Sequence, residues 1–257
     1  MRELSLFTGA GGGILGSKLL GWTTIGYVEN NDYRQRIIAR RIADGILDAE
    51  PIFGDIRAFI REGYAASYQG MVDVITAGFP CQPFSVAGKR LAENDPSNMW
   101  PETIETIRIV RPRYVFLENV PGLLSKSYIR RILGDLAEIF PYIRGGCLSA
   151  CTVGAPHQRT RLWIAADSEQ RRCTCNSREE ATSDTNGQRC EEQCGSEPIQ
   201  SEDAIFGRCG WWAVEPLLGR VAHGVANRVD RLEATGLGQV PAVVATAWKI
   251  LNATGDI

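Results

Sequence analysis

A single cysteine between two prolines is the residue in this sequence best placed to act as a nucleophile. Cys81 lies in the run 78–85, GFPCQPFS, directly after the apolar and β-branched stretch 72–77. That stretch predicts a buried parallel strand, which the prolines stop, and they also stiffen the loop that follows. Ligands bind at this edge of α/β sheets. The loop alone favours a structural cysteine in a tight turn, because free cysteines are more often buried than reactive.

A glycine-rich turn near the start of the chain has the form of a nucleotide-binding loop. The predicted strand 4–7 leads into the glycine-rich run 9–13 and then into an apolar helical pattern. A second predicted strand, 24–28, ends at Glu29, 20 residues after Gly9. An acid at about this spacing suits ribose hydroxyls. The loop by itself is also typical of a plain turn, but the loop and the acid together predict a cofactor site.

Two further carboxylates stand at the tips of predicted strands. Asp55 ends the predicted strand 51–55, where it could accept a hydrogen bond from an adenine amine or cap the following helix. Glu118 follows the apolar run 114–117 and precedes Asn119. Burial there would raise the pKa of the Glu118 carboxyl, and a carboxyl that holds a proton near neutral pH can act as a general acid. A solvated turn residue is the alternative.

Two arginines lie in a turn between the strands of a predicted hairpin, 147–153 and 161–166. Arg159 and Arg161 are at alternate positions, so in an extended segment their side chains share a face. A fixed guanidinium could hold a carbonyl oxygen or a phosphate. The alternative is an exposed basic hairpin without a ligand.

The overall composition indicates a globular protein without a membrane segment. The chain has 257 residues and a formal net charge of −2, so its overall charge does not attract nucleic acid, and any such contact would depend on local basic patches. No stretch is long and apolar enough to span a bilayer, and the N-terminus runs directly into a predicted strand. We therefore expect a monomeric cytoplasmic protein with reduced cysteines and no membrane partner.

The composition changes at residue 167. Residues 168–210 contain five of the eight cysteines and few large apolar residues, and their 5 arginines and 9 acidic residues give a net charge of −4. This composition predicts a loop-rich insert or a partly disordered linker. Four thiolates, Cys173, Cys175, Cys190 and Cys194, could hold zinc, but the single residue within the first pair is tighter than usual ligand spacing. We expect a linker without bound metal.

Together these motifs and their order resemble the DNA (cytosine-5)-methyltransferase family. The resemblance covers about residues 3–166 and 219–252, and includes the thiol loop, Glu118-Asn119-Val120 and the closing run 236–241, GLGQVP. It implies an α/β, Rossmann-like S-adenosylmethionine-dependent methyltransferase fold, with a mixed, mostly parallel sheet, helices on both faces and a small target-recognition insert. The implied division is a catalytic and cofactor-binding domain, 1–166, a short recognition or linker region, 167–218, and a segment returning to the catalytic domain, 219–257.

The resemblance also implies a reaction on double-stranded DNA. Cytosine would be flipped out of the duplex, Cys81 would add to ring carbon 6, and carbon 5 would accept a methyl group from S-adenosylmethionine. Glu118 would bind or protonate ring nitrogen 3, and Arg161 would hold the exocyclic oxygen. Asn119 would brace the thiol loop, and Arg159 belongs to the same catalytic set. The implied cofactor contacts are Phe7, Gly9, Gly11, Glu29, Asn30, Asp55, Ile56, Phe79 and Trp100.

Departures from the family pattern keep two alternatives open. His157 stands where the family usually has glutamine, Leu237 where the closing motif usually has asparagine, and the recognition region is short and acidic. One alternative is a non-catalytic remnant that binds DNA or cofactor. The other is an RNA cytosine methyltransferase on the same scaffold, whose Cys-Phe-Thr signature the chain lacks. Intact Cys81, Glu118 and Arg161 favour the DNA enzyme. Neither a target sequence nor a partner endonuclease follows from these residues.

Overall fold

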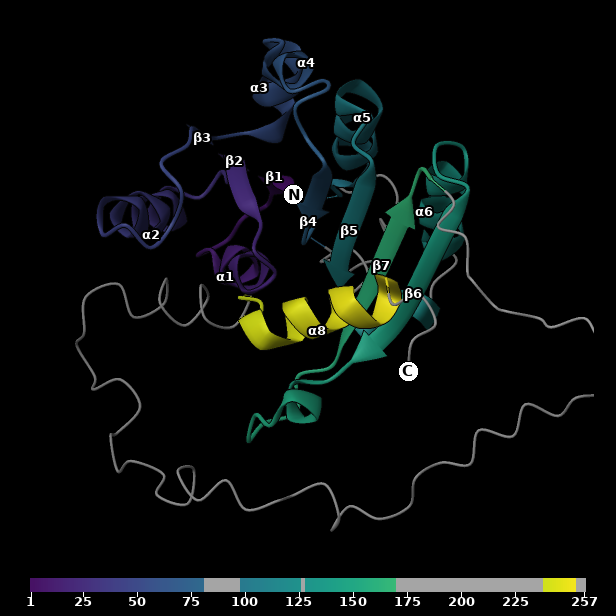
Figure 1. Ribbon diagram of the computed structural model, residues 1–257. Helices are drawn as coiled ribbons and strands as arrows, with labels where there is room; N and C mark the ends of the chain where they lie inside the picture. Colours follow the sequence, from purple (N-terminus) through teal and green to yellow (C-terminus); the bar gives the residue numbers. More distant parts are fainter. Residues whose placement is uncertain (81–97, 126–127, 170–237, 253–257) are drawn as a thin grey trace, which may run out of the picture.

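A seven-stranded sheet forms the centre of the computed structural model, which describes residues 1–80, 98–125, 128–169 and 238–252 (Figure 1). The strand order is β3-β2-β1-β4-β5-β7-β6. Strands β1 to β5 are parallel, and β7 runs antiparallel to both β5 and β6. The strands are β1 (Arg2–Leu6), β2 (Thr23–Val28), β3 (Ile52–Phe53), β4 (Val74–Ala77), β5 (Tyr114–Asn119), β6 (Tyr142–Leu148) and β7 (Arg161–Asp167).

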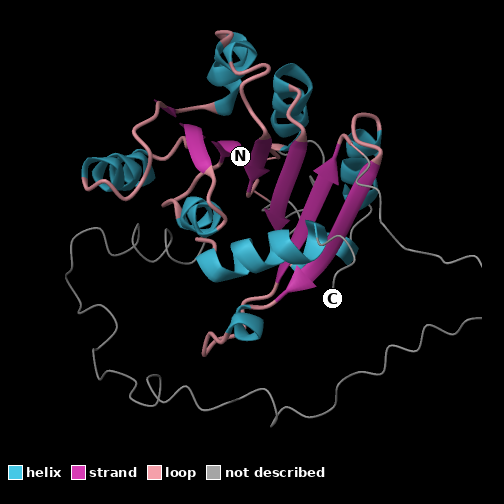
Figure 2. Cartoon of the chain, in the orientation of Figure 1, coloured by secondary structure: helices cyan, strands magenta, loops and turns pink. Residues whose placement is uncertain are grey.

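Helices cover both faces of this sheet, as predicted (Figure 2). Helices α3 to α6 pack on one face, and α1, α2 and α8 pack on the other. The helices are α1 (Gly12–Leu19), α2 (Asp32–Ala43), α3 (Ile56–Arg61), α4 (Tyr64–Ser67), α5 (Trp100–Val110), α6 (Tyr128–Ala137) and α8 (Pro241–Asn252). Two 3₁₀ helices, η3 (Pro121–Ser125) and η4 (Ala150–Val153), complete the described elements. None of the helices in the described ranges is long and apolar enough to cross a lipid bilayer.

The continuous apolar runs of the central strands explain this two-sided packing. Side chains alternate across a strand, so Val115 and Leu117 of β5 face α5 and α6, whereas Phe116 faces α8. On the α8 side, Trp248 contacts Phe116 and Trp22, with ring centroids 5.3 and 4.7 Å apart. Helix α8, from the end of the chain, is therefore anchored on the strands that carry the candidate site.

The hairpin predicted from the sequence is displaced in the structure. Its first strand is Tyr142–Leu148 rather than 147–153, and residues 150–153 form η4, which ends at Gly154 with φ +84°. Pairing with all seven residues of β7, from Leu148 opposite Arg161 to Tyr142 opposite Asp167, fixes the true register. Gly145 and Gly146 hide this strand in the sequence because glycine has low strand propensity. Cys81, Leu237 and the four cysteines considered for zinc lie outside the described residues.

Candidate active site

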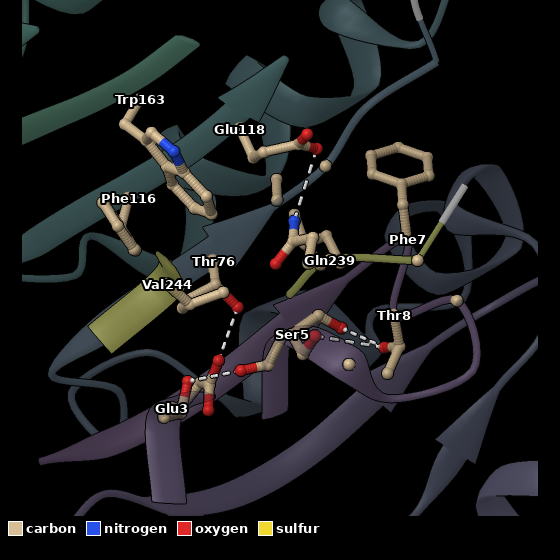
Figure 3. A pocket seen from close by; sticks show the side chains of 18 residues that line it. Glu3, Ser5, Phe7, Thr8, Thr76, Phe116, Glu118, Trp163, Gln239 and Val244 are labelled. Atoms are coloured by element: carbon tan, nitrogen blue, oxygen red, sulfur yellow. Dashed lines mark hydrogen bonds between the residues drawn. The ribbon is translucent and has the colours of Figure 1, made fainter. Parts of the chain in front are cut away.

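A cavity lies where the carboxyl ends of three parallel strands meet (Figure 3). Strand β1 leads into the glycine-rich loop, β4 leads into Gly78, and β5 carries Glu118 near its end. Parallel neighbours end at the same edge of a sheet, and ligands of open α/β folds bind there. The lining includes Phe7, Thr8, Gly9, Gly78, Glu118, Trp163 and Gln239. Residues that are more than 200 positions apart in the sequence thus share one site.

Glu29 is hydrogen-bonded to the glycine-rich loop. The backbone N–H of Gly9 donates to Glu29 Oε2 at 2.7 Å, and that of Asn31 donates to Oε1 at 3.0 Å. Gly9 and Gly11 have φ values of +62° and +86°, which favour glycine, and Phe7 also has a positive φ of +53°. A left-handed conformation is costly for phenylalanine and is concentrated at ligand sites. The loop and the acid predicted to cooperate are therefore in direct contact.

The other predicted cofactor residues cluster around the ends of β2 and β3. Asp55 caps α3, with its Oδ1 accepting from the Arg57 N–H at 2.9 Å, so the capping role considered from the sequence is present. Asp55 is exposed, and a carboxylate has acceptor capacity beyond one hydrogen bond. Ile56 is buried behind it, and Asn30 is exposed next to Glu29. Capping and ligand binding are thus compatible at Asp55.

The aromatic pair predicted near the cofactor is largely internal. Phe79 is buried and its ring centroid lies 5.3 Å from that of Trp100. Trp100 has no exposed surface, and its Nε1 donates to Asp135 of α6 at 2.7 Å. Asn119 Nδ2 donates to the Phe79 carbonyl oxygen at 3.2 Å, two residues before Cys81. Trp100 therefore packs against the Phe79 ring. Asn119 connects the end of β5 to the segment that precedes the thiol loop.

Glu118 is a largely buried acid in the cavity wall, with 12% of its side chain exposed. Arg161 Nε lies 2.8 Å from Glu118 Oε1, and Gln239 Nε2 lies 3.4 Å from Oε2. Burial raises the pKa of the Glu118 carboxyl above its ordinary value, although Arg161, Gln239 and Arg159 act in the opposite direction. The result is a carboxyl with an increased tendency to hold a proton.

The two arginines predicted to share a face have different partners. Arg161 pairs with Glu118, whereas Arg159 Nη2 donates to the Gly238 carbonyl oxygen at 2.7 Å. Burial lowers the pKa of the Arg159 guanidinium, and the neighbouring charge of Arg161 acts in the same direction. His157 lies exposed in the same turn. Arg159 therefore holds the segment that carries Gly238 against the site.

Sequence reasoning assigned no role to Gln239, which the structure places in the cavity wall. The signal was available in the closing run 236–241, which belongs to the resemblance, but its distance from Glu118 in the chain gave no reason to pair them. Figure 3 shows the Gln239 amide directed toward Glu118.

Comparison with known proteins defines the class. Residues 1–201 match the family model for C-5 cytosine-specific DNA methylases, so the chain belongs to that family. This agrees with the resemblance found in the sequence. The Dnmt2 methyltransferase of S. pombe superimposes with a TM-score of 0.53 at 22% identity, covering 66% of this chain and 52% of that one. That likeness concerns the fold, and with the family match it confirms the Rossmann-like methyltransferase architecture predicted from the sequence.

Two curated relatives are bacterial and viral type II methyltransferases. M.NgoMIV of Neisseria gonorrhoeae is 31% identical over 167 residues, which are 64% of this chain and 51% of the relative. M.CviJI of Paramecium bursaria Chlorella virus IL3A is 30% identical over 167 residues, which are 64% of this chain and 42% of the relative. The matched part of the chain thus spans about half the length of these relatives.

Proposed function

We propose that this protein transfers a methyl group from S-adenosylmethionine to carbon 5 of a flipped cytosine in double-stranded DNA. The observation that carries the proposal is the buried Glu118 carboxyl paired with Arg161, at the sheet edge that also bears the glycine-rich loop. In the sequence, the run that contains Cys81 follows β4. Membership of the C-5 cytosine-specific DNA methylase family supports the same reaction.

The residues of the glycine-rich loop fit the proposed cofactor. A Cβ on Gly9 would meet nothing within 4 Å, so its backbone is open to a ligand. Glu29 would bind the ribose hydroxyls with its remaining acceptor capacity, and Asp55 the adenine amine. Phe7, Gly11, Asn30, Ile56, Phe79 and Trp100 would complete the surroundings. The bound cofactor supplies an electrophilic methyl group.

The protein side chains would make carbon 5 reactive by adding to the other end of its double bond. The Cys81 thiolate attacks carbon 6, forming a sulfur–carbon bond as the double bond between carbons 5 and 6 is broken. Glu118 donates its proton or a strong hydrogen bond to ring nitrogen 3, and Arg161 holds the exocyclic oxygen. Electron density would then gather at carbon 5, which would take the methyl group as its bond to the sulfonium sulfur breaks and the demethylated cofactor leaves. Loss of the carbon-5 proton to water, with return of any nitrogen-3 proton to Glu118, would re-form the double bond and expel the Cys81 thiolate.

The positions of Asn119 and Arg159 suit supporting roles in this scheme. Asn119 bonds the Phe79 carbonyl oxygen and so restrains the entry to the thiol loop. Arg159 donates to the Gly238 carbonyl oxygen and so holds in place the segment that contributes Gly238 and Gln239 to the cavity wall. A flipped base must be held away from water while it reacts, which requires walls of this kind.

Transfer of radioactive methyl groups tests the proposal. Purified full-length protein, Cys81→Ala and Cys147→Ala are incubated with labelled S-adenosylmethionine and mixed-sequence DNA or RNA. Cys147 is an exposed cysteine on β6 and provides the matched control. We expect label in DNA from the wild type and Cys147→Ala, none from Cys81→Ala, and recovery of the label as 5-methylcytosine.

The remaining outcomes distinguish the alternatives. Label in RNA but not in DNA would assign the protein to an RNA methyltransferase. Binding of the cofactor without transfer to either nucleic acid would indicate a non-catalytic remnant. Substantial transfer by Cys81→Ala would exclude the covalent step while leaving methylation itself in place.

A further inference from the structure

Three glycines leave space at the candidate site for Gln239, which belongs to the run 236–241. A Cβ at Gly12 would overlap the Gln239 carbonyl oxygen, and a Cβ at Gly13 would lie 2.5 Å from Gln239 Oε1. A Cβ at Gly78 would lie 3.0 Å from Gln239 Nε2 and 3.2 Å from Glu118 Oε2. Real Cβ atoms essentially never approach within 3.0 Å of another group. The Gln239 side chain therefore fits between the glycine-rich loop and the end of β4 because these neighbours lack side chains.

Gln239 and Arg161 hold opposite oxygens of the Glu118 carboxyl. Arg161 Nε is 2.8 Å from Oε1, and Gln239 Nε2 is 3.4 Å from Oε2. The segment that carries Gln239 is fixed on one side by Arg159, which bonds Gly238, and on the other by α8. Among the described residues, the charged groups that face Glu118 are Arg159 and Arg161, and Gln239 is its uncharged partner.

We propose that Gln239 is a positioning residue that orients the Glu118 carboxyl toward the base and accommodates both of its protonation states. This inference rests on the proposed function. A primary amide carries both donors and an acceptor, so it can donate to a carboxylate and, turned over, accept from a carboxylic acid. Glu118 would pass between these states in each catalytic cycle. Leucine can make neither bond, and glutamate at neutral pH can only accept.

The first test measures the Glu118 carboxyl directly and does not depend on activity. The protein is labelled with ¹³C at glutamate side chains, and the Glu118 signal is assigned by its absence in Glu118→Gln. Loss of a donor to the carboxylate should raise the pKa of Glu118 in Gln239→Leu, and a nearby negative charge should raise it further in Gln239→Glu. Gln69→Leu, in an exposed turn, is the matched control and should leave the titration unchanged. An unchanged titration in a folded Gln239→Leu would overturn the contact.

The second test measures single-turnover methyl transfer against pH with saturating cofactor. Glu118 acts in its protonated form, so the rate falls as the pH rises above its pKa. In Gln239→Leu we expect this falling limb to move to higher pH and the maximal rate to drop about tenfold, a typical loss for one hydrogen bond to a charged group. Cofactor affinity, measured by titration, should change less than the rate.

The outcomes separate this inference from the proposed function. An active wild type with identical rate profiles for Gln239→Leu and Gln69→Leu would overturn the positioning role alone. An inactive wild type would overturn the proposed function and with it the catalytic part of the inference, while the carboxyl titration still decides whether Gln239 controls Glu118. Gln239→Glu keeps the length of the side chain, so a matching upward movement of its falling limb would show that the effect is electrostatic rather than a loss of packing.

Discussion

Replacing Gly16 by alanine should push helix α8 away from helix α1. A Cβ at Gly16 would lie 2.5 Å from Val244 Cβ and 2.8 Å from the Pro241 carbonyl oxygen. Reaching an ordinary contact of 3.4 Å from Val244 therefore requires a displacement of 0.9 Å. The obstructing atoms belong to the backbone and to a β-branched side chain, which is stiff, so α8 itself must move.

Two opposing effects set the size of the change. Alanine is favoured over glycine within a helix by up to about 1 kcal/mol. Overpacking a close interface costs typically about 1–3 kcal/mol. The contact with a backbone carbonyl places Gly16 toward the upper part of that range, so we expect the free energy of unfolding to fall by about 1–2 kcal/mol.

Gly134 in α6 provides the matched control. It is exposed, lies within a helix, and a Cβ there would meet nothing within 4 Å. Gly134→Ala should therefore gain only the helix propensity, about 0.5–1 kcal/mol. Comparing the two alanine variants removes the propensity term and isolates the packing cost.

Thermal and urea unfolding of the purified variants provide the measurement. For chains near this length, 1 kcal/mol corresponds to about 2–4 °C in Tm. The Tm of Gly16→Ala should fall and that of Gly134→Ala should rise. If Gly16→Ala is stabilised as much as Gly134→Ala, the close packing of α1 on α8 is wrong. The position of Gln239, which lies just before α8, would then be wrong as well.

Three further changes test buried polar groups. Glu3 has no exposed surface, accepts a hydrogen bond from Thr76 at 2.6 Å, and has a pKa raised by burial above its ordinary value of 4.5. Its contribution to stability is therefore complete below the unfolded-state pKa and is lost as the pH rises through the folded-state pKa. Glu3→Gln should remove the decline of the unfolding free energy between these two pKa values in urea titrations at several pH values. Glu118→Gln should lower single-turnover methyl transfer by about 100- to 10,000-fold while DNA affinity in gel-shift assays changes little, and a loss confined to cofactor affinity would contradict its catalytic role. Asn119→Ala leaves the buried Phe79 carbonyl oxygen without this donor and should cost about 1–3 kcal/mol of stability in urea unfolding, with no change counting against the brace.

The sequence was sufficient for the central strands and for the acids at their tips. Runs such as 114–117 are apolar on both faces, which only a strand covered by helices on each side tolerates. The 20-residue spacing between Gly9 and Glu29 likewise predicted a joint site, and the two residues share a hydrogen bond. These features depend on local pattern and on the common edge of parallel strands.

Features that depend on distant partners could not be predicted in the same way. The predicted first strand begins at residue 4, whereas β1 also includes Glu3, which is fully buried and accepts hydrogen bonds from hydroxyls of β2 and β4. A charged residue is rarely fully buried without such partners. Strand β6 is interrupted by Gly145 and Gly146, which have low strand propensity, and only its pairing with β7 fixes its bounds. Gln239 reaches Glu118 across 121 positions of sequence, a contact that neither periodicity nor spacing can indicate.

Covalent trapping tests the central claim most directly. A DNA duplex that contains 5-fluorocytosine is incubated with the full-length protein and S-adenosylmethionine, because fluorine at carbon 5 cannot leave as a proton does. The account predicts a denaturant-resistant protein–DNA adduct that requires the cofactor, forms with Cys147→Ala but not with Cys81→Ala, and gives by mass spectrometry a modified peptide containing Cys81. An active enzyme that methylates ordinary DNA but forms no such adduct, or forms it equally well with Cys81→Ala, would contradict the account.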